Sequence, residues 1–179
     1  MFNTIHYYIY LMRTKITALK TRLLGGLKKK KKKKHPNTVN IVSRYTPKQK
    51  TEGSAGFDLI ANLSSNNLLF RAGETHLVPT GVSIEIPKGK VGLLFIRSGL
   101  SVESPLGLTN GVGVIDSDYR GEILVPLRNF SASKRHTLLN GDRIAQLVIL
   151  DYFSPFLKHV SSLNDTIRSS GGFGSTGKN

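Results

Sequence analysis

Cysteine is absent from the sequence, and long hydrophobic runs are absent with it. Without cysteine the chain can form neither a disulfide framework nor a cysteine-based zinc site, and nothing indicates an oxidising compartment. The longest uncharged stretch near the N-terminus, Met1–Met12, is too short to span a bilayer. With 179 residues and 39% hydrophobic content, the sequence predicts one intracellular domain with a real core and no transmembrane helix.

Acidic residues are missing from the first part of the chain. Residues 1–51 contain 14 Lys and Arg and no Asp or Glu, whereas residues 52–179 contain 12 Lys and Arg against 11 acids. The net charge of +15 therefore belongs mainly to an N-terminal segment and is not spread over a fold. We interpret residues 1–36 as a basic extension.

Two patterns occur in this extension. Apolar residues recur at alternating steps of four and three, which is typical of one face of a helix. They are Ile5, Ile9, Met12, Ile16, Leu19 and Leu23. The lysines Lys28–Lys34 repel one another, so we expect them to be solvated and disordered. The patterns are compatible with a mitochondrial presequence, a helix on an anionic membrane surface, a nuclear-localisation signal or a nucleic-acid contact, and a solvated linker is the simpler alternative. Cytoplasm or nucleus is the expected location, with mitochondrial targeting as the alternative.

From about Val39 the chain consists of short apolar or alternating runs separated by Gly, Pro, Asn and Ser, which is typical of an all-β domain. Strands are expected around Val39–Ile41, Phe57–Ala61, Leu77–Val78, Val82–Ile86, Leu93–Ile96, Ile123–Leu127 and Ile144–Leu150. Pro79 and Gly81 are expected to separate two of them, and Leu93–Ile96 to be buried on both faces. A short helical turn is expected only at Ser101–Leu106. The pattern predicts a compact jelly-roll-like domain over residues 37–160.

The stretch Gly111–Glu122 carries candidate chemistry. Apolar residues lead into Asp116, Asp118, Tyr119 and Arg120, and a second alternating strand follows. This pattern predicts a hairpin that holds a carboxylate beside an aromatic ring, which suits a site that binds a flat ring and activates a water. A polar turn without further function is the alternative.

The C-terminal segment Arg168–Gly177 is rich in glycine, and its N–H groups, hydroxyls and arginine are donors that a polyphosphate needs. A frayed terminus is the alternative. Gly172–Lys178 matches the first positions of a P-loop, but Asn179 fails the next position and no helix follows to direct its N-terminus at a phosphate. An EF-hand is excluded as well, because Arg120 and Leu127 occupy ligand positions.

Five separated stretches resemble, in order, the motifs of the trimeric dUTP pyrophosphatases (dUTPases). They are Ala55–Ala61, Arg97–Ser101, Gly111–Glu122, Gly141–Val148 and Arg168–Gly177. The resemblance covers residues 38–177. It implies a distorted jelly-roll or β-clip-like subunit, a homotrimer whose active sites are shared between chains, and hydrolysis of dUTP to dUMP and pyrophosphate. Such an activity would keep uracil out of DNA and supply dUMP for dTTP synthesis.

The same resemblance implies roles for individual residues. Asp116 would be the catalytic base that activates the attacking water, and Tyr119 would pack against the deoxyribose and exclude a ribose. Asp58 would help hold Mg²⁺ through water. The remaining substrate-binding residues would be Arg97, Ser98, Gly99, Asn110, Gly113, Gln146, Arg168, Phe173, Gly174, Ser175 and Thr176. Residues 161–179 would form a flexible lid that orders on the substrate.

Several features leave alternatives open. A structural role is expected for Asp118, Arg120, Asp142 and Arg143. Ser169 stands where the family usually has Gly, which bears on lid closure. The nearest rival is dCTP deaminase, but Arg168–Ser170 lies in the lid and not beside a buried strand, where a group acting on the pyrimidine would be needed. The other rival is a regulatory protein that uses the basic extension on nucleic acid or a membrane.

Overall fold

The computed structural model describes residues 38–172. The unit that begins at Val39 contains every strand of these residues. No helix in this part of the chain has the length and apolar character needed to cross a membrane. The helix and the lysine run predicted within residues 1–36 lie outside the described residues.

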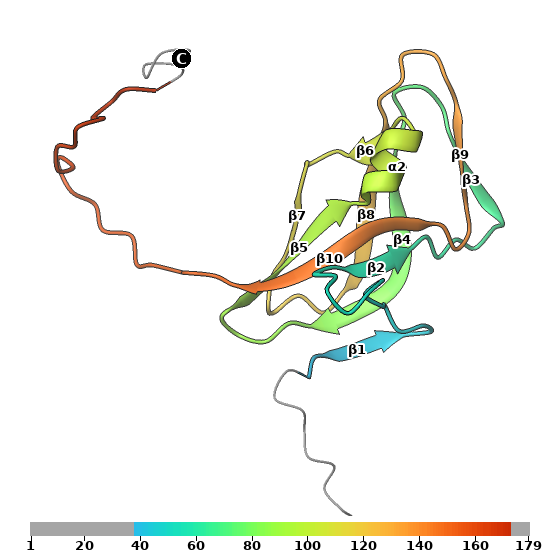
Figure 1. The fold of residues 1–179 in the computed structure, drawn as a ribbon, viewed down its shortest axis with the longest axis horizontal. Coiled ribbons are helices and arrows are strands. Elements are labelled where there is room, and N and C mark those ends of the chain that lie inside the picture. The colour runs from blue at the N-terminus through green and yellow to red at the C-terminus, as the bar shows by residue number, and fades with distance from the viewer. Residues whose placement is uncertain (1–37, 173–179) are drawn as a thin grey trace, which may run out of the picture. The chain divides into compact units, whose positions relative to one another are not determined.

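Strands dominate the described residues (Figure 1). The elements are β1 (Asn40–Ser43), β2 (Phe57–Ile60), β3 (Asn67–Phe70), β4 (Thr75–Glu85), β5 (Lys90–Ile96), α2 (Ser98–Glu103), β6 (Leu106–Leu108), β7 (Gly113–Ile115), β8 (Glu122–Asn129), β9 (His136–Leu139) and β10 (Arg143–Asp151). The predicted all-β, jelly-roll-like fold is therefore confirmed. Three short strands, β3, β6 and β9, were not predicted, because their few residues show too little alternation to stand out.

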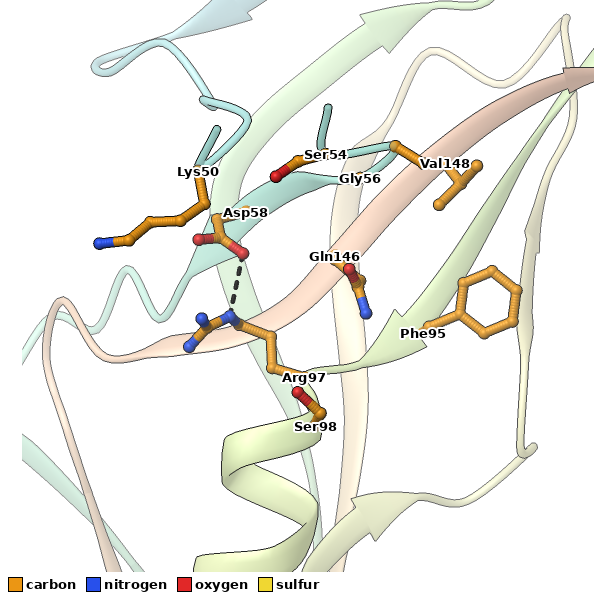
Figure 2. Close-up of a pocket in the computed structure, with 10 residues that line it drawn as sticks. Lys50, Ser54, Gly56, Asp58, Phe95, Arg97, Ser98, Gln146 and Val148 are labelled. Atoms are coloured by element: carbon orange, nitrogen blue, oxygen red, sulfur yellow. Dashed lines mark hydrogen bonds and ion pairs between the residues drawn. The ribbon is translucent and has the colours of Figure 1, made fainter. Parts of the chain in front are cut away.

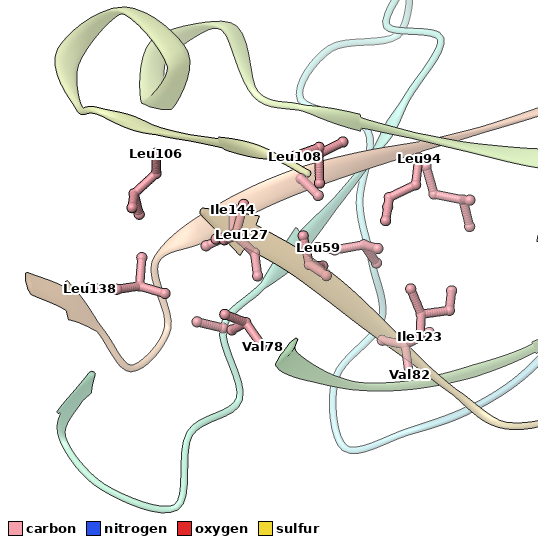
Figure 3. Close-up of a cluster of buried hydrophobic side chains, with 14 of the residues drawn as sticks. Leu59, Val78, Val82, Leu94, Leu106, Leu108, Ile123, Leu127, Leu138 and Ile144 are labelled. Carbon is pink, nitrogen blue, oxygen red and sulfur yellow. The ribbon is translucent and has the colours of Figure 1, made fainter. Parts of the chain in front are cut away.

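The strands form two four-stranded sheets, β1-β4-β8-β6 and β2-β10-β5-β7, and a two-stranded sheet of β3 and β9. Every strand pair is antiparallel. Apolar side chains from both larger sheets join one buried cluster (Figure 3). The cluster includes Leu59, Val78, Val82, Leu94, Leu108, Ile123, Leu127 and Ile144. Burial of this cluster is the main force that holds the sheets together.

The predicted break at Pro79 and Gly81 is wrong, because both residues lie inside the single strand β4. The strand continues through a bulge, which appears as a register shift against β8 between Pro79 and Ser83. Gly81 adopts a φ of 67°, which suits glycine, and its N–H donates to Oε1 of Glu122 at 2.6 Å. The buried Thr80 hydroxyl donates to the Ile123 carbonyl at 2.7 Å. At the bulge the Glu122 carboxylate thus pairs with the Gly81 N–H, and the Thr80 hydroxyl links β4 to β8.

The hairpin predicted for the stretch Gly111–Glu122 is also wrong. β7 pairs with β5, whereas β8 pairs with β4 and β6 in the other sheet. Residues 116–121 therefore connect two sheets. Strand periodicity shows where a strand begins and ends but not which strand it pairs with.

Two further expectations need correction. The short helix lies at Ser98–Glu103, earlier than predicted, and it ends where the Ser104 N–H donates to the Leu100 carbonyl at 3.0 Å. In β5, Gly92 and Leu94 are buried while Leu93 and Phe95 are only half-buried. One face of β5 therefore belongs to the core, and the other faces the cavity described below.

Asn129 is a buried polar hub between the β3–β4 turn and the β8–β9 loop. Its amide donates to the carbonyls of Phe70 (3.3 Å) and Lys134 (2.8 Å), and its Oδ1 accepts from the Ser131 N–H at 3.0 Å. We expect Asn129→Ala to lower the free energy of unfolding by about 2–4 kcal/mol, because buried partners lose their hydrogen bonds. Urea unfolding at one fixed protein concentration measures this loss. The exposed Thr137→Ala variant is the control, and an equal effect of both changes would contradict the prediction.

Candidate functional site

An open cavity of about 290 Å³ lies where β2, β5 and β10 approach the start of α2 (Figure 2). Its lining residues are Lys50, Ser54, Ala55, Gly56, Asp58, Phe95, Arg97, Ser98, Gln146 and Val148. Strand register assembles it, because Gln146 of β10 is the partner of Asp58 in β2 on one side and of Phe95 in β5 on the other. The cavity brings together four residues predicted for the site: Asp58, Arg97, Ser98 and Gln146.

The Asp58 carboxylate is held by two arginines. Its Oδ1 accepts from Nε of Arg97 at 2.9 Å, and its Oδ2 accepts from Nη1 of Arg143 at 3.0 Å. The Asp58 side chain is only 18% exposed, so these contacts offset the cost of its partial burial. Because Nε of Arg97 is bound to Asp58, the end of the guanidinium is left oriented and able to bind an anion. Arg143, for which a structural role was predicted, forms the ion pair that completes this arrangement.

The cavity does not contain a metal cage made by the protein. No group of three or more His, Asp or Glu side chains that could hold a metal occurs within residues 38–172. Asp58 is the one carboxylate that lines the cavity, and each of its oxygens already accepts one hydrogen bond. A carboxylate oxygen can accept further hydrogen bonds, for example from the waters of a hydrated ion. The donor set fits a magnesium ion held mostly by a ligand and by water.

Glycine makes room for the Gln146 side chain. A Cβ atom on Gly56 would lie 2.8 Å from Oε1 and 3.1 Å from Cβ of Gln146, so a larger residue would displace the amide. Sequence reasoning placed Gly56 in a motif without giving it a role. It also missed Lys50, Ser54, Phe95 and Val148 as lining residues. These residues reach the cavity because the β1–β2 loop folds back towards it and because the strands pair in this register. No local sequence pattern indicates either feature.

Asp116 and Tyr119 lie in the connection between β7 and β8. The Tyr119 N–H donates to the Asp116 carbonyl at 3.2 Å, and the Tyr119 hydroxyl donates to the Glu122 carbonyl at 2.9 Å. A Cβ atom on Gly121 would lie 2.6 Å from Cζ of Tyr119, so the ring packs on the glycine backbone. The Asp116 carboxylate is exposed and forms no hydrogen bond or ion pair with other described residues. This turn presents a free carboxylate beside a fixed aromatic ring.

Arg120 stabilises the same turn. Its Nη1 donates to the carbonyls of Ser117 (2.8 Å) and Tyr119 (2.9 Å), and its Nη2 lies 3.8 Å from Oε1 of Glu85. These contacts support the structural role predicted for Arg120. Asp142 is structural too, since its Oδ2 accepts from the Leu139 N–H at 2.8 Å.

Asn110, Gly113 and Gly99 do not line the cavity. Asn110 is exposed, and its carbonyl accepts from the Val112 N–H at 2.7 Å. Gly113 is buried in β7, where a Cβ atom would lie 3.0 Å from Cβ of Leu94. Gly99 belongs to α2 and has open space around its Cα. Within one chain the predicted site is thus divided between the cavity and the surroundings of β7.

Residues 152–172 follow β10 without a helix or strand, and almost all of them are exposed (Figure 1). Nε of Arg168 donates to the Gly171 carbonyl at 2.9 Å. Ser169 has a φ of 45°, a left-handed value that glycine adopts more easily. The other predicted residues of this segment, Phe173, Gly174, Ser175 and Thr176, lie outside the described residues.

Comparison with known proteins points to one family. The family model described as dUTPase matches residues 44–177. The chain is 48% identical over 150 residues to the deoxyuridine 5'-triphosphate nucleotidohydrolase of Desulfitobacterium hafniense (strain DSM 10664 / DCB-2), an alignment that covers 79% of this chain and 98% of the relative. It is 42% identical over 139 residues to the protein of that name from Finegoldia magna, and this alignment covers 78% of this chain and 96% of the relative.

Solved structures agree with the sequence comparisons. The dUTPase of Staphylococcus bacteriophage 80alpha, solved with dUPNHPP, has a TM-score of 0.67 and 28% identity, and the match covers 79% of this chain and 99% of that one. A mutant dUTPase from phage phi11 of S. aureus, described for its coordination of a structural Mg(II) ion, has a TM-score of 0.62 and 26% identity over 70% of this chain and 98% of the other.

Proposed function

Because the chain belongs to the dUTPase family and is a dUTP diphosphatase, we propose that it converts dUTP to dUMP and pyrophosphate with a water that Asp116 activates. The observation that supports this proposal most directly is the cavity of the conserved fold, where Arg97, Ser98 and Gln146 offer donors to a phosphate chain. The reaction keeps uracil out of DNA and supplies dUMP for dTTP synthesis.

Asp116 would act as the general base. Its carboxylate is free, and the turn that carries it is fixed by Arg120 and by the contact between Tyr119 and Glu122. An ionised carboxylate beside the α-phosphate takes a proton from one water, and the resulting hydroxide attacks phosphorus while pyrophosphate leaves. The exposure of Asp116 in the single chain leaves room for both the water and the substrate.

The active site needs more than one chain. Ile115, which precedes Asp116, pairs with Gly92 of β5, whereas the cavity residues Arg97 and Ser98 follow the opposite end of that strand. At ~3.3 Å per residue, the run from Gly92 to Arg97 spans roughly 16 Å, too far for one carboxylate to serve a phosphate bound by Arg97. We therefore propose a homotrimer in which Asp116 of one chain meets the cavity of a neighbouring chain.

Exposed apolar side chains support this assembly. Val114 on the edge strand β7 is 61% exposed, and Leu77 on β4 is 63% exposed. Beyond β10, Phe156 and Ile167 are fully exposed on a segment without secondary structure. Apolar surface of this extent is typical of an interaction face.

Selectivity for deoxyuridine would come from the Asp116 turn and from β7. The Tyr119 ring, fixed over Gly121, would pack against deoxyribose and occupy the space of a ribose 2′-hydroxyl. The Asn110 amide and the backbone near Gly113 would read uracil. Cytosine presents its donor and acceptor in the reverse order, so it would leave the buried groups that read uracil without hydrogen bonds. Each such unpaired group costs about 1–3 kcal/mol of binding free energy.

Phosphate binding would use Arg97, Ser98, Gly99 and Gln146 from the cavity side. Asp58 would contact magnesium only through water, because the two arginines already hold both of its oxygens. When bound, magnesium would neutralise charge on the phosphate oxygens and polarise them. The lid would contribute Arg168, Phe173, Gly174, Ser175 and Thr176, and Ser169, in a backbone conformation that favours glycine, would make its closure more costly.

Deamination of dCTP remains the rival reaction, and the cavity argues against it. Its lining contains one carboxylate, and the two arginines hold it, so the cavity itself supplies no free base for such a reaction. The roles proposed for residues 1–36, including contact with nucleic acid or an anionic membrane and mitochondrial targeting, rest on sequence alone.

Product analysis tests the proposal. We would incubate the purified protein and Mg²⁺ separately with dUTP, UTP, dCTP, dTTP, dATP and dGTP and identify the products. The expected result is dUMP and pyrophosphate from dUTP, with the other nucleotides unchanged. Survival of dUTP, or formation of dUTP from dCTP, would contradict the proposed function.

A further inference from the structure

We propose that Lys50 is an additional phosphate-binding residue of the cavity, an inference that rests on the proposed hydrolysis of dUTP. Lys50 lies in the loop between β1 and β2 and lines the cavity. Figure 2 shows it at the same end of the cavity as Asp58, across from Phe95. A lysine binds phosphate as a compact charge without a fixed geometry, which suits a flexible phosphate chain.

The loop holds Lys50 in place through backbone contacts on both sides. The Asp58 N–H donates to the Lys48 carbonyl at 3.0 Å, which fixes the loop to β2 before Lys50. After Lys50, the Thr51 N–H donates to the Ser54 hydroxyl at 3.0 Å, and the Ser54 N–H donates to the Thr51 carbonyl at 3.1 Å. Because the loop is already fixed, binding of a ligand by Lys50 costs less conformational entropy than binding by a lysine on a mobile loop.

The charges around the cavity leave Lys50 without a counter-ion. Asp58 is the one carboxylate in the lining, and Arg97 and Arg143 occupy both of its oxygens at 2.9 and 3.0 Å. Lys50 forms no hydrogen bond or ion pair with any residue between 38 and 172. The cavity lining therefore carries two cations, Lys50 and Arg97, and one carboxylate, which Arg143 also contacts. A bound triphosphate would supply the negative charge that this arrangement lacks. The magnesium ion that accompanies a triphosphate neutralises only part of the phosphate charge, so negative charge remains for Lys50 to bind.

Lys50 would act on binding more than on the chemical step. Its side chain is exposed, and the loop that carries it is distinct from the turn of Asp116. A contact made equally with the bound substrate and with the transition state changes KM and leaves kcat nearly constant. Because uracil and the sugar would bind elsewhere, Lys50 should distinguish a triphosphate from a monophosphate.

The test compares Lys50→Met with Lys48→Met, Lys50→Arg and the unaltered full chain. Lys48 is an exposed lysine of the same loop that does not line the cavity, so it controls for loss of surface charge. Steady-state kinetics with dUTP and Mg²⁺ give KM and kcat, and equilibrium binding is measured with dUPNHPP and with dUMP. We expect Lys50→Met to raise KM and the Kd for dUPNHPP about five- to tenfold, with kcat and the Kd for dUMP within about twofold.

Lys48→Met should behave as the unaltered chain, and Lys50→Arg should restore most of the lost affinity. If Lys50→Met matches Lys48→Met, or if it weakens dUMP and dUPNHPP equally, the role of Lys50 is overturned while dUTP hydrolysis stands. Failure of the unaltered chain to hydrolyse dUTP would instead refute the proposed function. The dUPNHPP measurement still decides the Lys50 contact in that case.

Discussion

Asp116→Asn is expected to lower kcat for dUTP by about a thousandfold or more, with KM changed by no more than a few-fold. The amide keeps the size and most hydrogen bonds of the carboxylate but cannot take a proton from water, and general-base catalysis contributes about 10²–10⁴ in rate. The Asp116 side chain is exposed and forms no hydrogen bond or ion pair with the described residues, so its replacement should leave the fold unchanged. Steady-state kinetics with dUTP and Mg²⁺ measure the effect.

Asp118→Asn is the matched control. Asp118 lies in the same turn, carries the same charge, is exposed, and has no hydrogen bond or ion pair within the described residues. Its replacement removes one negative charge near the site but no proposed proton acceptor, so kcat should stay within about threefold. Equal losses in both variants would indicate an electrostatic effect of the whole turn and would contradict the assignment of Asp116 as the base.

The fold was predictable where one face of a strand is buried. Val82, Ile84 and Ile86 alternate with Ser83 and Glu85 in the sequence, and these three apolar residues are at most 8% exposed. Such alternation follows directly from the burial of one sheet face. It does not specify strand partners, so the sequence predicted a hairpin where β7 and β8 belong to different sheets.

The family resemblance predicted four of the residues that line the cavity, Asp58, Arg97, Ser98 and Gln146, but not how the cavity is assembled. Asp58 and Arg143 are far apart in sequence, and the register of β2 against β10 brings them to 3.0 Å. Lys50 reaches the cavity because its loop folds back onto β2. Neither contact has a local signature, because long-range register is decided by the packing of the whole domain.

Mixed trimers should recover activity from two inactive variants, and this is the second large effect that we expect. Asp116→Asn removes the base, and Arg97→Met removes a phosphate ligand on the cavity side. If each active site takes Asp116 from one chain and Arg97 from another, a random equal mixture restores both groups in about a quarter of the sites. If both groups came from the same chain, no mixture could contain an intact site.

The measurement requires proof that the chains have mixed. The two variants would carry different affinity tags, be unfolded together in urea, refolded and purified through both tags in sequence, so that only mixed trimers remain. The expected result is kcat per chain at about a third of the unaltered value, because every mixed trimer holds one intact site out of three, against a background near zero for each variant refolded alone. Within one chain roughly 16 Å of β5 separates Gly92, the strand partner of Ile115, from Arg97. Doubly purified trimers no more active than their parents would therefore refute the shared site.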